Sequence, residues 1–405
     1  MRQNNFNVYF CAQCNMPSPF IREMKKVYFD SAATTELRSE VIICISEALK
    51  TEYGNPSSTH SYGRSSKSLL ENCRKEIAAH FNVSAAEIIF TSGGTEADNL
   101  VLNSCVRDLG VTRIISSKIE HHAVLHTIEE LQNKHGITVD HVALDHCGQV
   151  NHEHLEELLQ ADGQKTLVSL MHVNNEVGNI LDIRRTAELC KQYGVLFHSD
   201  TVQSAGHYEL DFSEIPIDFA AVAAHKFHGP KGAGFAFIRK NTGLKPLIYG
   251  GTQERGLRAG TEAVYAIAGM AEALKISYQN LAEEKAYITG LKDYFKSKLS
   301  AEIEGISFNG SCGDNEKSTY TLLNVCLPVT KEKGMLLLFQ LDLKGIACSQ
   351  GSACQSGSTT GSHVLNNVLS EEDLLKPSLR FSFSSFNTMD EIDYVVAALK
   401  EFVES

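Results

Sequence analysis

Short apolar runs and helical patterns alternate along the chain from about residue 27 to residue 240. Six runs predict strands: Ile88–Thr91, Arg113–Ser117, Lys165–Val173, Val195–Asp200, Phe219–Ala224 and Gly232–Arg239. Several of these runs are apolar at both odd and even positions, as strands covered on both faces tend to be. Apolar residues at helical spacing predict the helices between them, such as Ser65–Phe81, Thr95–Leu109, Ala123–Lys134 and Ile183–Tyr193. The alternation predicts an α/β fold with a mostly parallel sheet flanked by helices.

The pattern changes in the last third of the chain. A long helical pattern covers Val264–Leu299, and strand and helix patterns follow near Thr319–Leu327, Gly334–Leu343, Leu379–Ser384 and Met389–Val403. We therefore expect a large domain over residues 27–262. A smaller α+β domain would cover residues 263–405 and include the N-terminal segment 1–26.

Composition excludes several classes of protein. The chain has 405 residues and a net charge of −12, with no basic block of the kind that grips nucleic acid. No apolar run approaches the roughly 20 residues that span a bilayer. Eleven scattered cysteines indicate a reducing compartment. Because residues 1–26 resemble neither a secretory signal nor a transit peptide, we expect a cytoplasmic protein.

Cys11 and Cys14 form a C-x-x-C motif near the N-terminus. A zinc knuckle would need a second pair at suitable spacing, and none follows. A loose terminal segment that carries two thiols is favoured over a metal or redox site.

Lys226 is the first candidate for chemistry. It follows a strand pattern in A-A-H-K-F-H-G-P-K-G, Ala223–Gly232. A buried amine must be paired, deprotonated or chemically used, for example in a Schiff base with an aldehyde cofactor. Asp200 ends the preceding strand, where it could pair with the ring nitrogen of pyridoxal phosphate (PLP). On these two residues alone, a surface lysine and an ordinary loop carboxylate explain the pattern equally well.

Thr91–Ala97 reads as strand, tight Gly93-Gly94 turn and helix start. Exposed amides at a helix N-terminus suit a phosphate, and Thr95 adds a hydroxyl. A plain helix cap is the commoner meaning of such a turn.

Cys354 lies in a stretch, Ser349–Ser362, in which eight of 14 residues are Gly or Ser. A mobile loop is expected there, so its thiol could reach into a site and swing out again. Cys348 stands in the apolar run G-I-A-C, which favours a buried strand residue over a second nucleophile.

Arg380 is the last candidate, in the strand pattern S-L-R-F-S. Its guanidinium suits a substrate carboxylate, although an exposed strand arginine fits equally well.

Taken in order, these segments resemble the cysteine desulfurases of the class V aminotransferase family over about residues 27–403. The matching motifs are Y-F-D-S-A-A-T-T, Y-G-N-P-S-S, T-S-G-G-T-E, E-H-H-A-V, H-V-N-N-E-V-G, H-S-D-T-V-Q, A-H-K, E-R-G-L-R-A-G-T, G-S-A-C and S-L-R-F-S. The G-S-A-C motif and the long loop after it resemble the group that feeds iron–sulfur assembly and related sulfur delivery. A fold type I PLP enzyme, active as a homodimer, is implied.

The resemblance also implies roles for the matching residues. Lys226 would form the Schiff base and shuttle protons, His121 would stack on the ring and assist, and Cys354 would be the nucleophile. Asn55 and Arg380 would bind the substrate carboxylate. The residues implied in cofactor binding are Gly94, Thr95, His121, Asn175, Asp200, Gln203, Ala223, His225, Lys226 and Thr261, the last supplied by the partner subunit. A zinc site at His121, His122 and His126 is disfavoured, because no cysteine or acid clearly joins them.

The implied reaction takes sulfur from L-cysteine, giving L-alanine and a Cys354 persulfide for an acceptor protein or a small thiol. Two departures stand out. Ala223 occupies a position where family members usually carry a serine that touches the phosphate. Members that dock an iron–sulfur scaffold carry a longer C-terminal tail than the 25 residues after Arg380. A dedicated acceptor or a small thiol is therefore an alternative to that scaffold.

Three other functions remain open. A class V aminotransferase would keep Lys226, Asp200 and Arg380 but would not need Cys354. A selenocysteine lyase would differ only in substrate preference. A non-enzymatic PLP-binding protein has Ala223 as its one support.

Overall fold

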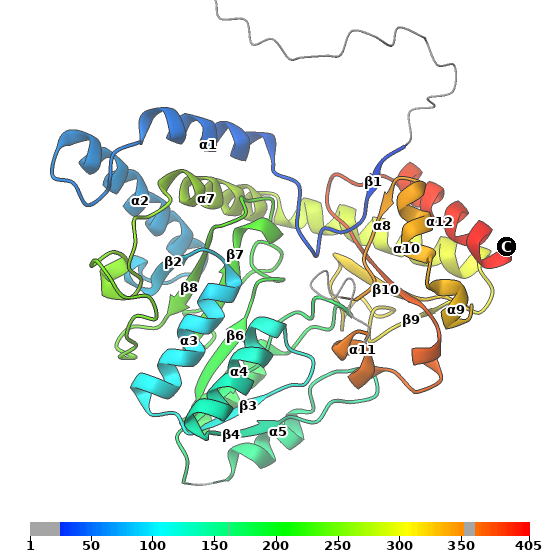
Figure 1. Ribbon diagram of the computed structural model, residues 1–405, viewed down its shortest axis with the longest axis horizontal. Helices are drawn as coiled ribbons and strands as arrows, with labels where there is room; N and C mark the ends of the chain where they lie inside the picture. Colours follow the sequence, from blue (N-terminus) through cyan, green and yellow to red (C-terminus); the bar gives the residue numbers. More distant parts are fainter. Residues whose placement is uncertain (1–24, 162, 352–360) are drawn as a thin grey trace, which may run out of the picture.

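The computed structural model describes residues 25–161, 163–351 and 361–405 (Figure 1). Within these residues, seven strands form the large sheet in the order β2-β8-β7-β6-β5-β3-β4. Only β8 runs antiparallel to its neighbours, which confirms a mostly parallel sheet. The strands are β2 (Ile88–Thr91), β3 (Arg113–Ser116), β4 (Thr138–His141), β5 (Thr166–Ser169), β6 (Leu196–Asp200), β7 (Phe219–Ala223) and β8 (Gly234–Ile238).

Helices cover both faces of this sheet because its strands are apolar on both parities. Ile89 packs into a core with α3 and α4, whereas its neighbours Ile88 and Phe90 pack into another core with α2 and α7. The helices of this part are α1 (Ser39–Thr51), α2 (Ser61–His80), α3 (Gly94–Leu109), α4 (His122–His135), α5 (His152–Leu159), α6 (Ile183–Gln192) and α7 (Val264–Gln279). Short 3₁₀ helices are η1 (Ala85–Glu87), η2 (Ala224–Lys226) and η3 (Glu254–Gly256).

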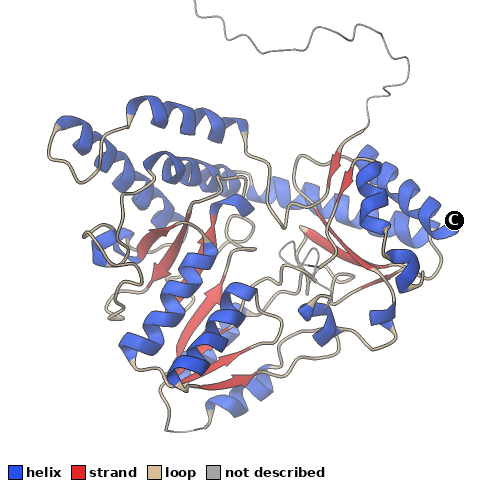
Figure 2. Cartoon of the chain, in the orientation of Figure 1, coloured by secondary structure: helices blue, strands red, loops and turns tan. Residues whose placement is uncertain are grey.

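A smaller sheet lies beside the large one (Figure 2). In it β10 (Leu322–Cys326) pairs antiparallel with β9 (Ser307–Phe308) and β12 (Ser378–Ser382). A separate parallel pair joins β1 (Val27–Tyr28) to β11 (Ile346–Ala347). The helices here are α8 (Leu281–Glu302), α9 (Lys331–Gly334), α10 (Leu337–Leu343), α11 (His363–Val368) and α12 (Met389–Glu404), with the short η5 (Asp373–Leu375).

The long helical pattern from Val264 to Leu299 forms two helices, which meet at Asn280. The apolar side chains of α7 join the core of the large sheet, whereas those of α8, such as Phe295, join the core of the small sheet. The domain boundary expected after residue 262 stays a prediction. Within the described residues, the change of core falls between these two helices.

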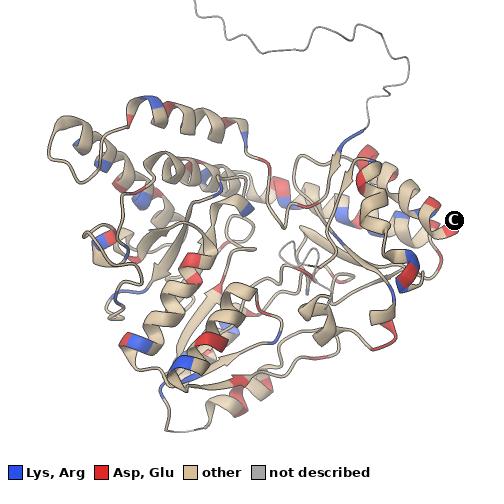
Figure 3. Cartoon of the chain, in the orientation of Figure 1, with Lys and Arg blue, Asp and Glu red and all other residues tan. Residues whose placement is uncertain are grey.

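Other elements differ from their sequence patterns at the ends. β5 stops at Ser169 rather than at residue 173, although the Leu170 and His172 amides still donate to carbonyls of β6. Helix α1, strand β4 and helix α5 had no predicted counterpart. Acidic and basic side chains are interspersed over the helices (Figure 3). No helix within the described residues is long and apolar enough to cross a membrane.

Candidate active site

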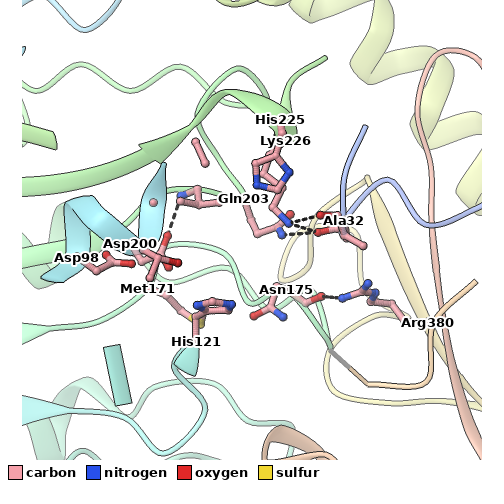
Figure 4. Close-up of a pocket in the computed structure, with 15 residues that line it drawn as sticks. Ala32, Asp98, His121, Met171, Asn175, Asp200, Gln203, His225, Lys226 and Arg380 are labelled. Carbon is pink, nitrogen blue, oxygen red and sulfur yellow. Dashed lines mark hydrogen bonds between the residues drawn. The ribbon is translucent and has the colours of Figure 1, made fainter. Parts of the chain in front are cut away.

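A pocket lies where β6 and β7 end. These neighbouring parallel strands finish at Asp200 and Ala223, so the side chains that follow them meet at one edge of the sheet. All of the predicted cofactor residues except Thr261 line the pocket, and Arg380 lines it as well. Figure 4 shows these side chains converging from separate elements.

Lys226 reaches this pocket from η2, directly after β7. Its Nζ donates hydrogen bonds to the carbonyls of Ala32 (2.6 Å) and Ala33 (2.8 Å). These carbonyls hold the amine at the pocket wall (Figure 4). An amine fixed in this way suits covalent attachment to an aldehyde.

Asp200 is the acid nearest the end of β6. Its side chain is 6% exposed, and Oδ1 accepts a hydrogen bond from the Val202 amide at 2.9 Å. Burial raises the pKa of Asp200 to about 6, against the opposing effects of the Val202 amide and the Lys226 charge. A carboxylate that burial penalises in this way favours a cationic ligand, such as a protonated ring nitrogen.

The turn before α3 has the shape of an anion cradle. The φ of Gly93 is +153°, a conformation that is essentially restricted to glycine. A Cβ added to Gly94 would lie 2.5 Å from Val202 Cγ2. The first helical hydrogen bond runs from the Ala97 amide to the Gly93 carbonyl, so the preceding amides have no partner within the helix.

Glu96 braces this turn from the first turn of α3. One carboxylate oxygen accepts a hydrogen bond from the Ser92 amide at 2.8 Å, and the other lies 2.8 Å from Arg258 Nε. Ala223 faces the cradle from the end of β7 and brings no hydroxyl.

Two histidines of the pocket are neutral. Burial, and then the positive charge of Lys226, lowers the pKa of both His121 and His225 to about 4. The Nδ1 atom of His121 accepts a hydrogen bond from the Ala123 amide at 3.1 Å. That bond leaves the proton of the neutral His121 ring on Nε2.

Arg380 enters the pocket from β12 of the small sheet and is 1% exposed. Its guanidinium bonds the Asn175 carbonyl and the Asp30 carboxylate, each at 2.8 Å. Gln203 donates from Nε2 to the Ala32 carbonyl at 2.9 Å. The backbone of Asn175 and the side chain of Gln203 are thus fixed by contacts with other parts of the wall.

Two predicted residues lie away from the pocket. Asn55 is exposed between α1 and α2, where its Oδ1 accepts a hydrogen bond from the Ser57 amide. Thr261 is exposed shortly before α7. Their roles in substrate and phosphate binding stay predictions.

Cys354, Cys11 and Cys14 lie outside the described residues. Cys348 is described. Burial, followed by the negative charge of Asp30, raises its pKa to about 12. That environment disfavours a reactive thiolate at Cys348.

The sequence motifs missed two acids of the site. Asp98 lines the pocket from α3, and Asp30 holds Arg380. A signal for Asp98 was present, because it is a carboxylate among residues that predict a buried helix face, such as Ala97 and Val101.

The donor set fits PLP. An imine-forming amine, a buried acid and a glycine cradle at a helix N-terminus line one pocket, as an aldehyde with a basic ring nitrogen and a phosphate requires. Ala223 lowers the number of side-chain donors at the phosphate end, but the backbone amides remain.

Comparison with known proteins gives a family match over most of the chain. The model of the aminotransferase class-V family matches residues 27–395. The chain is 37% identical to cysteine desulfurase IscS of Dictyoglomus turgidum, over 94% of this chain and 95% of that protein. It is 36% identical to cysteine desulfurase IscS of Clostridium botulinum, over 94% and 95%. A solved NifS-like protein superposes with a TM-score of 0.85 at 34% identity, covering 94% of this chain and all of that one.

Proposed function

The chain belongs to the aminotransferase class-V family as a PLP-dependent cysteine desulfurase, and we propose how its residues take sulfur from L-cysteine. The observation that carries this proposal is the meeting of Lys226, Asp200 and the Gly93-Gly94 turn in one pocket. When bound, PLP supplies an aldehyde that condenses with amines and a ring that withdraws electrons.

Three groups of the chain hold that cofactor. Lys226 Nζ binds it covalently, Asp200 keeps its ring nitrogen protonated, and the amides at the start of α3 bind its phosphate. Thr261 of a second subunit adds a hydroxyl to the phosphate site. Asn175 and Gln203 line the same pocket and would contact the ring.

Lys226 and His121 move the protons. With cofactor and substrate bound, Lys226 Nζ would act as the base that takes a proton from the substrate carbon, and the carbonyls of Ala32 and Ala33 keep this amine at the pocket wall. The neutral His121 carries its proton on Nε2 and would donate it to a substrate atom that becomes negatively charged during the reaction.

Arg380 and Asn55 bind the substrate carboxylate. The ion pair with Asp30 fixes the guanidinium plane before substrate arrives, which lowers the ordering cost of binding. Because Asp30 accepts a hydrogen bond from Nη2 of Arg380, a substrate carboxylate would share this guanidinium with Asp30.

Cys354 is the nucleophile. Its thiolate attacks the substrate sulfur, a sulfur–sulfur bond forms and the carbon–sulfur bond breaks. The electron pair stays with the substrate carbon, which takes up a proton. The products are L-alanine and a Cys354 persulfide.

The described residues on either side of 352–360 support access of Cys354 to the pocket. On one side, Ser349 exchanges two backbone hydrogen bonds with Arg380 (2.7 and 3.2 Å). On the other side, the Ser362 hydroxyl donates to Glu176, the neighbour of Asn175. The described residues next to this segment thus lie beside the pocket-lining residues Arg380 and Asn175.

A homodimer is the proposed assembly. Exposed apolar side chains gather on α1 and the segment after it: Ile42 (50% exposed), Ile43 (58%), Leu49 (55%) and Tyr53 (69%). Exposed apolar groups concentrated in this way are typical of subunit interfaces. Such a dimer is what would bring Thr261 to a phosphate site.

The persulfide passes to a protein acceptor for iron–sulfur or other sulfur-containing cofactors, or to a small thiol. The cytoplasm is the proposed location. All eight described cysteines are free thiols, and a persulfide carrier needs a compartment that keeps thiols reduced.

The test is the Cys354→Ala variant with L-cysteine, using Cys348→Ala as the matched control. We expect Cys354→Ala to bind PLP normally while alanine and persulfide formation collapse, and Cys348→Ala to retain most activity. Alanine production that persists in Cys354→Ala contradicts the assigned nucleophile. Transamination without sulfur release by the unaltered protein contradicts the desulfurase function.

A further inference from the structure

Asp98 is a buried carboxyl group of the pocket wall for which the proposed reaction has no use. It lies near the start of α3, is 1% exposed and lines the same pocket as Asp200. Figure 4 shows the two side chains next to each other, Asp98 from α3 and Asp200 from the end of β6. When two buried carboxyl groups lie this close, repulsion disfavours the state in which both are negatively charged.

His198 is the group that meets Asp98. It stands two residues before Asp200 on β6, so both side chains lie on one face of the strand. His198 is fully buried, and its Nε2 lies 3.3 Å from Asp98 Oδ1. Neither of these two buried atoms makes a hydrogen bond within the described residues, so a proton on Asp98 would have His198 Nε2 within reach. The other ring nitrogen, Nδ1, lies 2.9 Å from Ser169 Oγ.

The charges around Asp98 favour its protonated form. Burial, followed by the negative charges of Asp200 and Glu120, holds the pKa of Asp98 well above its ordinary value. Burial also lowers the pKa of His198 to about 3, so the imidazole brings no positive charge. Glu120 accepts hydrogen bonds from the Met171 amide and the Ser117 hydroxyl, but burial raises its own pKa to about 8, so Asp200 is the main negative charge that acts on Asp98 at neutral pH.

We propose that Asp98 is a positioning residue which, as a neutral acid paired with His198, leaves Asp200 as the negative group that faces the cofactor ring. In this arrangement the Asp98 hydroxyl donates to His198 Nε2, and Nδ1–H donates to Ser169 Oγ. The three side chains then form one buried chain of hydrogen bonds. The inference rests on the proposed function only in that a cofactor with a basic ring nitrogen binds here.

Two substitutions at one position test the neutral pair. Asp98→Asn keeps a neutral hydrogen-bonding group, whereas the bulkier Asp98→Leu keeps the branching at Cγ and leaves His198 Nε2 without a polar partner. The measurement is the dissociation constant of PLP for the apo-protein, by absorbance titration. We expect less than about a threefold change for Asp98→Asn and a loss of about tenfold or more for Asp98→Leu. Equal losses in both variants would mean that the charge of Asp98 is needed, and no loss in Asp98→Leu would mean that the pair does nothing; either result overturns the proposal.

Asp218→Asn is the matched control. Asp218 accepts a hydrogen bond from the Phe197 amide at 2.9 Å, at the opposite end of the same strand pair. The Asp218→Asn substitution should lower the melting temperature and leave the affinity for PLP unchanged. If Asp98→Leu does not fold, infrared spectroscopy of the apo-protein decides. We expect Asp98→Asn to remove a protonated-carboxyl band, and an unchanged spectrum contradicts the proposal. Because neither readout involves sulfur, both keep their meaning if the desulfurase assay fails.

Discussion

At the scale of single residues, the charge of the buried Asp200 carboxyl group links the stability of the protein to cofactor binding. Its pKa is about 6 in the described structure, because burial disfavours the charge. Folding raises this pKa above the ordinary value of 3.8, so the carboxyl group contributes stability that is present at low pH and lost as pH rises through 6. A cation bound at Asp200 reverses that loss.

The cofactor should therefore stabilise the protein more at pH 7.5 than at pH 5. The measurement is the difference in melting temperature between PLP-bound and apo-protein across this range. We expect the difference to grow with pH in the unaltered protein and to be smaller and flatter in Asp200→Asn. A difference that is independent of pH in the unaltered protein contradicts the pairing of Asp200 with a cationic ring.

Ala223 leads to a second prediction at this scale. Ala223→Ser would add a hydroxyl at the phosphate end of the pocket and should tighten PLP binding by about tenfold, the effect of one hydrogen bond to a charged group. Ala221→Ser, two residues earlier on β7, is the control and should bring no gain in affinity. Equal affinities for Ala223→Ser and the unaltered protein would place the phosphate elsewhere.

Residues with a local signal were predictable from the sequence, and residues defined by a distant partner were not. Lys226 and the glycine turn stand out because their type is unusual at a strand end. Asp30 gave no such signal, since its role depends on Arg380, which lies 350 positions away in the chain. A lone carboxylate in a turn is otherwise an ordinary surface residue.

At the scale of elements, the start of α3 leaves little room for a larger residue. Gly94→Ala would drive a methyl group against Val202 and should cost about 1–3 kcal/mol of stability, with a parallel loss of PLP affinity. Gly290→Ala is the control, because it lies in α8 with nothing within 4 Å of the added Cβ.

Gly290→Ala should stabilise the protein by about 0.5–1 kcal/mol. Chemical denaturation measures the stability of both variants. If Gly94→Ala is as stable as the unaltered protein and binds PLP as tightly, the proposed steric conflict with Val202 is wrong.

Elements were predictable where burial is regular along the sequence. The central strands are apolar on both parities, and their predicted positions fall close to the observed ones. The pattern from Val264 to Leu299 could not show that its two halves face different cores, because both halves have helical spacing. Edge strand β4 escaped prediction, since its residues are half-buried or exposed.

At the scale of the whole molecule, the proposed dimer depends on the exposed apolar residues of α1. Ile43→Glu would place a charge in the apolar α1 surface, and we expect it to yield monomers with weaker PLP binding. Leu375→Glu is the control, because Leu375 is also exposed (62%) but lies in η5, away from α1. Analytical ultracentrifugation measures the mass. An Ile43→Glu protein that remains dimeric excludes this surface as the interface.

The central claim is that the pocket cleaves the carbon–sulfur bond of L-cysteine and passes the sulfur to Cys354. The most direct test is peptide mapping by mass spectrometry after the PLP-bound protein has been mixed with one equivalent of L-cysteine. We predict one additional sulfur atom on the peptide that contains Cys354, together with one alanine per site. Sulfur found on Cys348 or on another thiol, with Cys354 unmodified, would contradict the account.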